Sequence, residues 1–372
     1  MATHRLHSRS RLALSLTLLL ICIKATVGFG IPKGRDKSVC YRSRTSHQRR
    51  ILPRVNSKIE PNGLARYFRQ EQQRSLLALR SRSQEDVDAT ASPNGSRSLV
   101  TTVALTALTV TASAAKLGIL PGPIQPDGSF GPYTDALIAR DVGATLLTAV
   151  LGYGYVKIIT TAAARGYLES RDSRKLIHTF SAPLFILFWP LYSQAAAARL
   201  FCFIVPFTNG IRLYTAAQGS SEEASLAAAV SRTGDSREAV GGPFIYVCIM
   251  AACILLQWRD PVTVVALSNL AAGDGLADLV GRRWGGTSKW PGLDKSVAGT
   301  AAFWLGATIC SIGLLLWLQF TNCLVLPIAG QELIFTIAGI SLVAALFELL
   351  PWADDNYTVP LSAAVLTMLL LR

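Results

Sequence analysis

The chain contains a long series of apolar segments, each close to the length that crosses a lipid bilayer. About 20 consecutive apolar residues are needed to span the hydrocarbon core as a helix. From Ser98 onward such segments follow one another with short polar connections. The expected spans are residues 98–119, 136–160, 175–192, 197–217, 243–258, 261–281, 297–319, 333–350 and 357–371. The sequence therefore predicts an all-α, polytopic integral membrane protein with about seven to nine transmembrane helices.

The composition agrees with this prediction and removes one class of partner. The chain is 51% hydrophobic and only 16% charged, with a mean hydropathy of +0.37. Its net charge of +13 is concentrated in residues 1–96, which carry 18 Lys and Arg against 6 Asp and Glu. The rest of the chain is nearly neutral, so the basicity belongs to the N-terminal extension. We therefore expect no nucleic-acid partner.

The N-terminal extension has the pattern of targeting sequences. Arginines precede an apolar run at residues 12–23, and small residues follow up to Gly28, which predicts a signal peptide over residues 1–28. Residues 29–92 are rich in Arg and Ser and poor in acids, which is typical of a plastid transit peptide or a disordered basic extension. Gly28 followed by Phe29 looks like the junction of bipartite plastid targeting. We expect a multi-pass plastid (chloroplast) membrane protein, with residues 98–372 as its membrane domain. The alternative is an ER-type signal followed by a basic lumenal segment.

The predicted spans place the charged connections on one side of the membrane. Residues 165–175, 217–242, 281–296 and 351–356 emerge together, whereas the opposite connections are short or poor in charge. Topological bias explains gathered Lys and Arg, but not the acids that share the same side. The sequence therefore predicts a polar site at one membrane surface.

The strongest candidate for this site lies between residues 269 and 303. Asp274 and Asp278 are four residues apart, so on a helix they share one face and could hold one Mg²⁺. The alternative is a salt bridge to the neighbouring arginines. Basic residues and glycines follow, of the kinds that neutralise phosphates or let backbone amides approach them. They are Gly281, Arg282, Arg283, Gly285, Lys289, Lys295, Ser296 and Gly299. Ser296 and the start of the next helix could also present amides to a phosphate. The spacing is not that of a P-loop.

Three further groups of polar residues are candidates for the same site. Arg174 and Lys175 could contact phosphate, with His178 as a proton acceptor, or the cluster could anchor a helix at the interface. Asn209 and Arg212 lie within a span, where a buried arginine needs a partner. Arg237 lies in a polar loop that could bind anions or be a solvated connector.

The last group is at the end of the second-last span. Asp354 and Asp355 could complete a metal shell together with Asp274 and Asp278, and Glu348 could join the shell or orient an acceptor. The alternative is that Asp355 or Asn356 caps the last helix.

At these residues the chain resembles the phytol kinase branch of the polyprenol and dolichol kinase family. The resemblance extends from about Asp141 to the C-terminus. The matching pieces are RKLIH (174–178), VPFTNGIRL (205–213), SRTGDSREAVGGP (231–243), GDGLADLVGRRWG (273–285), DKSVAGT (294–300) and ELLPWADDNYTVPL (348–361). Ala298 departs from the acidic residue that dolichol kinase-like members tend to carry there, which resembles the phytol and farnesol kinase side.

The resemblance implies a kinase that transfers a phosphoryl group from CTP, or another nucleoside triphosphate, to a membrane isoprenoid alcohol. The alcohol would be phytol, or geranylgeraniol or farnesol, and phytyl phosphate in plastids would feed tocopherol synthesis. Asp274 and Asp278 would bind Mg²⁺, and His178 or one of the acids would accept the proton of the alcohol.

Two other functions fit parts of the pattern. A related cytidylyltransferase would form a CDP-lipid and release pyrophosphate. A transporter would line a path with Asp274, Asp278 and Arg212, and would carry inverted repeats, which this sequence does not show.

Overall fold

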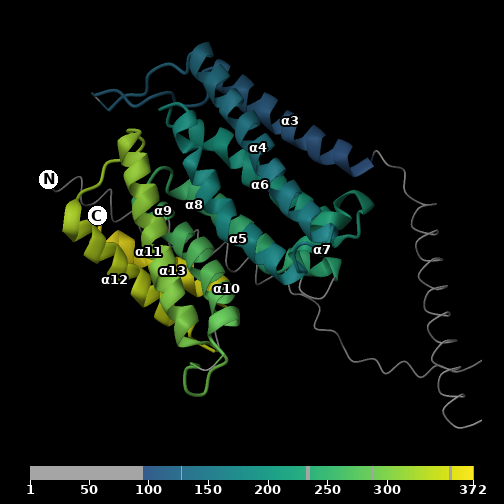
Figure 1. The fold of residues 1–372 in the computed structure, drawn as a ribbon. Helices are drawn as coiled ribbons and strands as arrows, with labels where there is room; N and C mark the ends of the chain where they lie inside the picture. Colours follow the sequence, from purple (N-terminus) through teal and green to yellow (C-terminus); the bar gives the residue numbers. More distant parts are fainter. Residues whose placement is uncertain (1–94, 127, 232–234, 287, 352–353, 372) are drawn as a thin grey trace, which may run out of the picture. The chain divides into compact units, whose positions relative to one another are not determined.

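The computed structural model describes residues 95–126, 128–231, 235–286, 288–351 and 354–371 (Figure 1). The predicted signal peptide and transit peptide lie outside the described residues.

The described chain is helical, and it contains isolated β-bridges but no strand. The α-helices are α3 (Gly95–Lys116), α4 (Asp135–Ala164), α5 (Ser170–Leu187), α6 (Ala198–Ala217), α7 (Ala224–Val230), α8 (Gly242–Leu256), α9 (Pro261–Ser268), α10 (Asp274–Trp284), α11 (Val297–Phe320), α12 (Gly330–Glu348) and α13 (Asp355–Leu370). A π-helical turn, η4 (Asn269–Gly273), joins α9 to α10, so residues 261–284 form one continuous helix.

Among the described residues, six helices are long and apolar enough to cross a membrane. They are Asp135–Ala164, Ala198–Ala217, Ser236–Leu256, Pro261–Trp284, Val297–Phe320 and Gly330–Glu348. The predicted spans at 175–192 and 357–371 correspond to α5, which begins with a charged turn, and to α13, which has 16 residues. The first predicted span corresponds to α3, whose apolar part is the shorter stretch Val100–Lys116. The all-α, polytopic prediction is confirmed.

The helix at residues 261–284 is the centre of the packing. It is 72% buried over its most apolar window, whereas α4 is 17% buried. It contacts α5 and also α11, α12 and α13, which gather beside it (Figure 1). Phe303, Leu315 and Ile337 are fully buried in this part of the core. Because this helix packs against so many others, a charged side chain on it is costly unless it is paired within the protein.

Near the start of this helix, a buried cluster of polar side chains connects α4 and Arg259 to the loop between α5 and α6. The Asp141 carboxylate accepts hydrogen bonds from the Ser193 amide at 2.5 Å, the Ser193 hydroxyl at 2.7 Å and the Tyr133 hydroxyl. Burial and this carboxylate raise the pKa of Tyr133 above its usual range. Arg259 donates to the carbonyl oxygens of Trp189, Tyr192 and Ser193. These bonds fix the loop between α5 and α6.

At the other end, α10 approaches α5 closely enough to exclude a side chain. A Cβ atom built on Gly275 would overlap the Thr179 hydroxyl of α5. A Cβ on Gly273 would lie 2.8 Å from the Phe303 ring of α11. The two glycines therefore let α10 pack tightly between α5 and α11.

This contact predicts that Gly275→Ala destabilises the protein. The added methyl group forces α5 and α10 apart, and overpacking of this kind costs about 1–3 kcal/mol. Gly152→Ala in α4 is the matched control, because a Cβ at Gly152 has nothing within 4 Å. The control is expected to be neutral or slightly stabilising. Thermal unfolding in detergent measures both variants, and equal midpoints for the two would contradict the prediction.

Candidate active site

A cavity of about 430 Å³ lies where α5, α10, α11, α12 and α13 meet. We call it the polar cavity because charged side chains and glycines dominate its lining. Of the residues that the sequence predicts for the site, those that line the polar cavity are Arg174, Lys175, Asp274, Asp278, Gly281, Arg282, Gly285, Lys289, Lys295, Ser296, Gly299, Glu348 and Asp355. Segments far apart in the sequence therefore supply one site, as the predicted one-sided gathering of charge requires.

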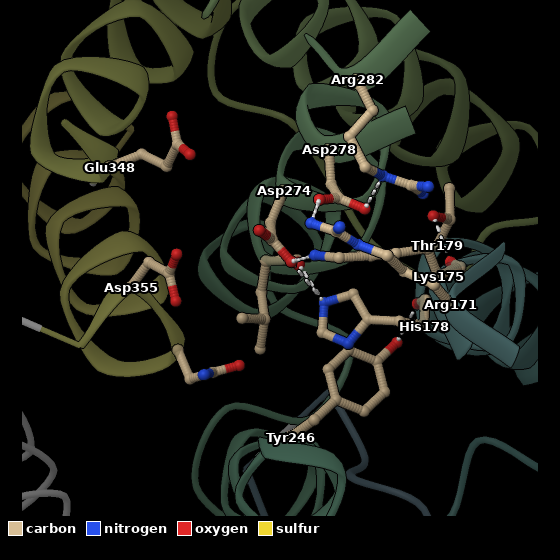
Figure 2. Close-up of polar contacts among 12 residues, drawn as sticks. Arg171, Lys175, His178, Thr179, Tyr246, Asp274, Asp278, Arg282, Glu348 and Asp355 are labelled. Atoms are coloured by element: carbon tan, nitrogen blue, oxygen red, sulfur yellow. Dashed lines mark hydrogen bonds and ion pairs between the residues drawn. The ribbon is translucent and has the colours of Figure 1, made fainter. Parts of the chain in front are cut away.

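Asp274 is a buried and closely paired acid of this cavity. Its Oδ2 atom lies 2.9 Å from Lys175 Nζ and 3.1 Å from His178 Nε2, and all three side chains are largely buried. Lys175 and His178 are three residues apart on α5, so both reach the same carboxylate (Figure 2). A buried charge is tolerated when it is paired in this way.

The same contacts fix which nitrogen of His178 carries a proton. His178 Nε2 lies 2.8 Å from the Leu270 carbonyl oxygen, which can only accept. Nε2 is therefore a donor, to this carbonyl and to Asp274. In the neutral imidazole, Nδ1 is then the acceptor.

The π-helical turn sets the position of Asp274. The Asp274 amide bonds to the Asn269 carbonyl, five residues back, as well as to Ala271. Such a turn inserts an extra residue into an α-helix and is frequent at functional sites. The turn thus shifts the register of α10 relative to α9 just before the carboxylate.

A residue of another helix bonds to the backbone of α5 next to His178. The Tyr246 hydroxyl of α8 donates to the His178 carbonyl at 3.1 Å and accepts from the Ala182 amide at 2.9 Å. Those two backbone groups are four residues apart and would ordinarily bond to each other. Pro183 follows and cannot donate to the Thr179 carbonyl. The imidazole of His178 lies between Asp274 and the Tyr246 ring, whose centroid is 4.4 Å away (Figure 2).

Asp278 is held by arginines. Its carboxylate accepts from Arg282 Nε at 2.9 Å and lies 3.7 Å from Arg171. Arg282 also donates to Asp172 of α5 at 2.8 Å. This is the salt bridge that the sequence left open as the alternative to a metal shared by Asp274 and Asp278.

The acids that gather with Asp274 are Glu348 and Asp355. One carboxylate oxygen from each of the three lies within 4.8 Å of the others. Figure 2 shows Glu348 and Asp355 on the side of Asp274 away from Lys175 and His178. Lys295 Nζ lies 2.6 Å from Glu348 and 3.5 Å from Asp355. A group of carboxylate oxygens of this kind suits a hard divalent cation such as Mg²⁺.

Asp354 has a capping role next to this group, and Asn356 donates to it. The Asp354 side chain accepts from the Asn356 amide at 2.9 Å and from its side-chain nitrogen at 2.8 Å. Asp354 is therefore the N-cap of α13. The capping that the sequence offered for Asp355 or Asn356 belongs to the residue before them.

The start of α11 offers fewer amides to a phosphate than the sequence suggested. Ser296 Oγ accepts from the Gly299 amide at 3.1 Å, and the Val297 amide bonds to the Ser288 carbonyl at 2.8 Å.

Gly281 leaves room for the Ser296 hydroxyl, which would lie 3.1 Å from a Cβ atom built on Gly281. Gly281 and Gly299 therefore allow α10 to pack closely on α11, and both also line the polar cavity.

Three predicted phosphate ligands lie elsewhere. Arg212 forms a two-pronged ion pair with Glu223, at 2.9 and 3.0 Å, and its guanidinium covers the Tyr153 ring. It lines a second cavity together with Asn209. Arg237 is largely exposed beside Asp235, and Arg283 pairs with Asp172 at 3.3 Å.

Comparison with known proteins decides the family. A search against protein-family models found no match, and no solved structure matched the chain. Among curated proteins, "Probable phytol kinase, chloroplastic" of Triticum aestivum is 32% identical over 239 residues, covering 63% of this chain and 79% of that protein. "Phytol kinase 1, chloroplastic" of Arabidopsis thaliana is 34% identical, covering 62% of this chain and 76% of that protein. The chain belongs to the phytol kinase family. This confirms the resemblance that the six sequence motifs indicated.

Some residues at the site lie outside those that the sequence motifs predicted. Tyr246 lies in a strongly apolar helix, where sequence reasoning treats an aromatic residue as packing. Arg171 and Asp172 precede the predicted phosphate ligands of α5 but were not assigned a role. A hydroxyl inside an apolar span was the available signal for Tyr246, since it needs a partner there.

The contact of Tyr246 with α5 yields a prediction about backbone protection. In Tyr246→Phe the Ala182 amide loses its acceptor, so hydrogen exchange in residues 178–186 should speed up. The lost hydrogen bond is expected to cost about 1–3 kcal/mol of local stability. Tyr153→Phe is the control, because Tyr153 is half-exposed on α4. Unchanged exchange in Tyr246→Phe would show that α5 closes its own hydrogen bond without the hydroxyl.

Proposed function

We propose that this protein is a phytol kinase, which transfers the γ-phosphoryl group of CTP, or of another nucleoside triphosphate, to the hydroxyl of phytol. The products are phytyl phosphate and a nucleoside diphosphate. The observation that carries the proposal is the polar cavity, where five helices bring cations, three clustered carboxylates and a buried His–Asp pair together. Membership of the phytol kinase family supports it.

The cations of the cavity would bind the triphosphate. Phosphoryl transfer needs positioning and charge neutralisation more than covalent chemistry. Lys175 lies largely buried beside Asp274, and Arg174 and Arg282 line the same space. Lys289 and Lys295 come from the segment that connects α10 to α11. Together these side chains surround a space that suits a charged nucleotide tail.

The three clustered carboxylates would hold Mg²⁺. Asp274, Glu348 and Asp355 offer oxygen ligands from three helices. When bound there, the ion would neutralise charge on the phosphate oxygens. Lys295 occupies the same acids in this structure and offsets their mutual repulsion.

His178 would accept the proton of the alcohol. Its Nε2 donates to Leu270 and Asp274, which leaves Nδ1 as the basic nitrogen. As the alcohol oxygen bonds to the γ-phosphorus, the bond from that phosphorus to the bridging oxygen breaks, and the proton moves to Nδ1. The Asp274 carboxylate stabilises the imidazolium that forms.

The cellular setting follows from the same proposal. The relatives named above are called chloroplastic, and the chain carries spans that suit a membrane. We infer a plastid membrane location, reached through the signal and transit peptides predicted for residues 1–92. Phytyl phosphate made there would feed tocopherol synthesis.

Full-length protein in membranes, supplied with phytol, Mg²⁺ and CTP labelled in its γ-phosphate, should yield labelled phytyl phosphate. Asp274→Asn should lower this rate by about 100-fold or more, because the imidazolium and the metal both lose their charge partner. Asp278→Asn is the comparison one turn along α10, and it should cost less, since Asp278 serves a salt bridge.

The products separate this proposal from its rivals. Pyrophosphate and a CDP-lipid would establish a cytidylyltransferase. No labelled lipid with any nucleotide would reject the kinase. A larger loss of rate in Asp278→Asn than in Asp274→Asn would favour Mg²⁺ binding by Asp274 and Asp278, as expected from the sequence.

The metal assignment has its own test in Glu348. Glu348→Gln removes one charged ligand, so the Mg²⁺ concentration for half-maximal rate should rise about tenfold or more. Glu332→Gln at the exposed start of the same helix is the matched control and should leave it unchanged. An unchanged Mg²⁺ dependence in Glu348→Gln would remove Glu348 from the metal shell.

A further inference from the structure

The second cavity has a different character from the first. It encloses about 100 Å³ between α4, α5, α6, α7 and α8. Most of its lining is apolar, with Val156, Leu213, Val247 and Met250 among the side chains, and no acidic residue is among the described residues that line it. We call it the apolar cavity. A triphosphate or a divalent cation would not be stable in such surroundings.

Two residues connect the apolar cavity to the polar cavity. Arg174 lines both of them. His178 lines the apolar cavity, while its Nε2 is 3.1 Å from Asp274 of the polar cavity. A hydroxyl group at the His178 end of the apolar cavity would therefore lie at the boundary with the polar cavity, where the γ-phosphate of the proposed nucleotide would meet it.

The charge balance of the apolar cavity also favours a neutral, amphipathic occupant. Of the two arginines that line it, Arg212 is already neutralised by the two-pronged pair with Glu223, and Arg174 also lines the polar cavity. Asn209 and Ser181 add uncharged polar groups. A small-molecule site of this type combines an apolar wall with a few polar groups that orient the ligand.

The volume restricts how much of an occupant fits. A cavity of about 150 Å³ binds benzene, so this smaller one holds about one isoprene unit. The rest of a long tail must lie outside it. The lining helices α4 and α8 belong to the two least buried of the six candidate spans, with 17% and 22% of their windows buried. Their apolar faces would be open to the hydrocarbon of the bilayer, where such a tail is soluble.

We infer that the apolar cavity binds the hydroxyl-bearing isoprene unit of the alcohol and sets its oxygen beside His178, leaving the remaining tail in the lipid. This inference rests on the proposed function and deepens it. Specificity then comes from the allylic end that phytol, geranylgeraniol and farnesol share. Chain length contributes little.

The test fills the cavity from α4. Val156→Phe places a ring in the apolar cavity, whereas Val150→Phe makes the same change at an exposed position of the same helix. Phytol, geranylgeraniol and farnesol are each assayed with saturating nucleotide in full-length protein. Val156→Phe should raise KM for all three alcohols by a common factor of about tenfold or more. In Val156→Phe, KM for the nucleotide should not change. Val150→Phe should have the same KM values for the alcohols and the nucleotide as the unmodified protein.

A second measurement keeps the inference separate from the kinase activity. A farnesol analogue with a photoreactive group next to its hydroxyl should label α5 or α8 in the unmodified protein, and less so in Val156→Phe. If labelling occurs there but no alcohol is phosphorylated, the cavity assignment stands and the proposed function fails.

Other results would overturn the inference while leaving the kinase intact. Unchanged KM in Val156→Phe would show that the alcohol binds elsewhere. An increase in KM that grows with the length of the alcohol would show that the apolar cavity binds the tail of the alcohol. Labelling displaced by excess phospholipid but not by farnesol would assign it to a bilayer lipid.

Discussion

The site depends on one buried charge, that of Asp274. A carboxylate inside a membrane-spanning helix is expensive unless it is paired, and here Lys175 and His178 of α5 pair it at 2.9 and 3.1 Å. This pairing requires α5 and α10 to lie close together, which Gly275 permits by leaving room for Thr179. The same approach brings Leu270 within hydrogen-bonding distance of His178. The pairing of Asp274, the packing of α5 against α10 and the tautomer of His178 therefore depend on one another.

The two cavities divide the proposed reaction between a charged partner and an apolar one. Cations and clustered carboxylates line the larger space, and aliphatic side chains line the smaller one. His178 lies between them, and the Tyr246 hydroxyl bonds to the α5 backbone beside it. A water-soluble nucleotide and a lipid-soluble alcohol could therefore bind in different surroundings and bring only their reacting groups together, beside His178 at the boundary of the two cavities.

The structure also separates residues that the sequence grouped together. Asp274 and Asp278 share a helix face, but Arg282 and Arg171 take up Asp278. Glu348 and Asp355 approach Asp274 instead, from helices more than 70 residues further along the chain. Arg212 finds its partner in Glu223 and faces the apolar cavity. Helix packing brings Glu348 and Asp355 to Asp274, whereas Asp278 pairs with Arg282 of its own helix and with Arg171 of α5.

The sequence by itself determined the polytopic helical fold, the family and most residues of the polar cavity. These follow from local features: span length, the cost of charge in a membrane, and motifs of fixed spacing. Only the tertiary structure decided which acids cluster, which amides of α11 are already bonded, and that Tyr246 contacts α5. Those outcomes depend on distances between helices far apart in the chain, and the spacing of residues along one helix does not contain them.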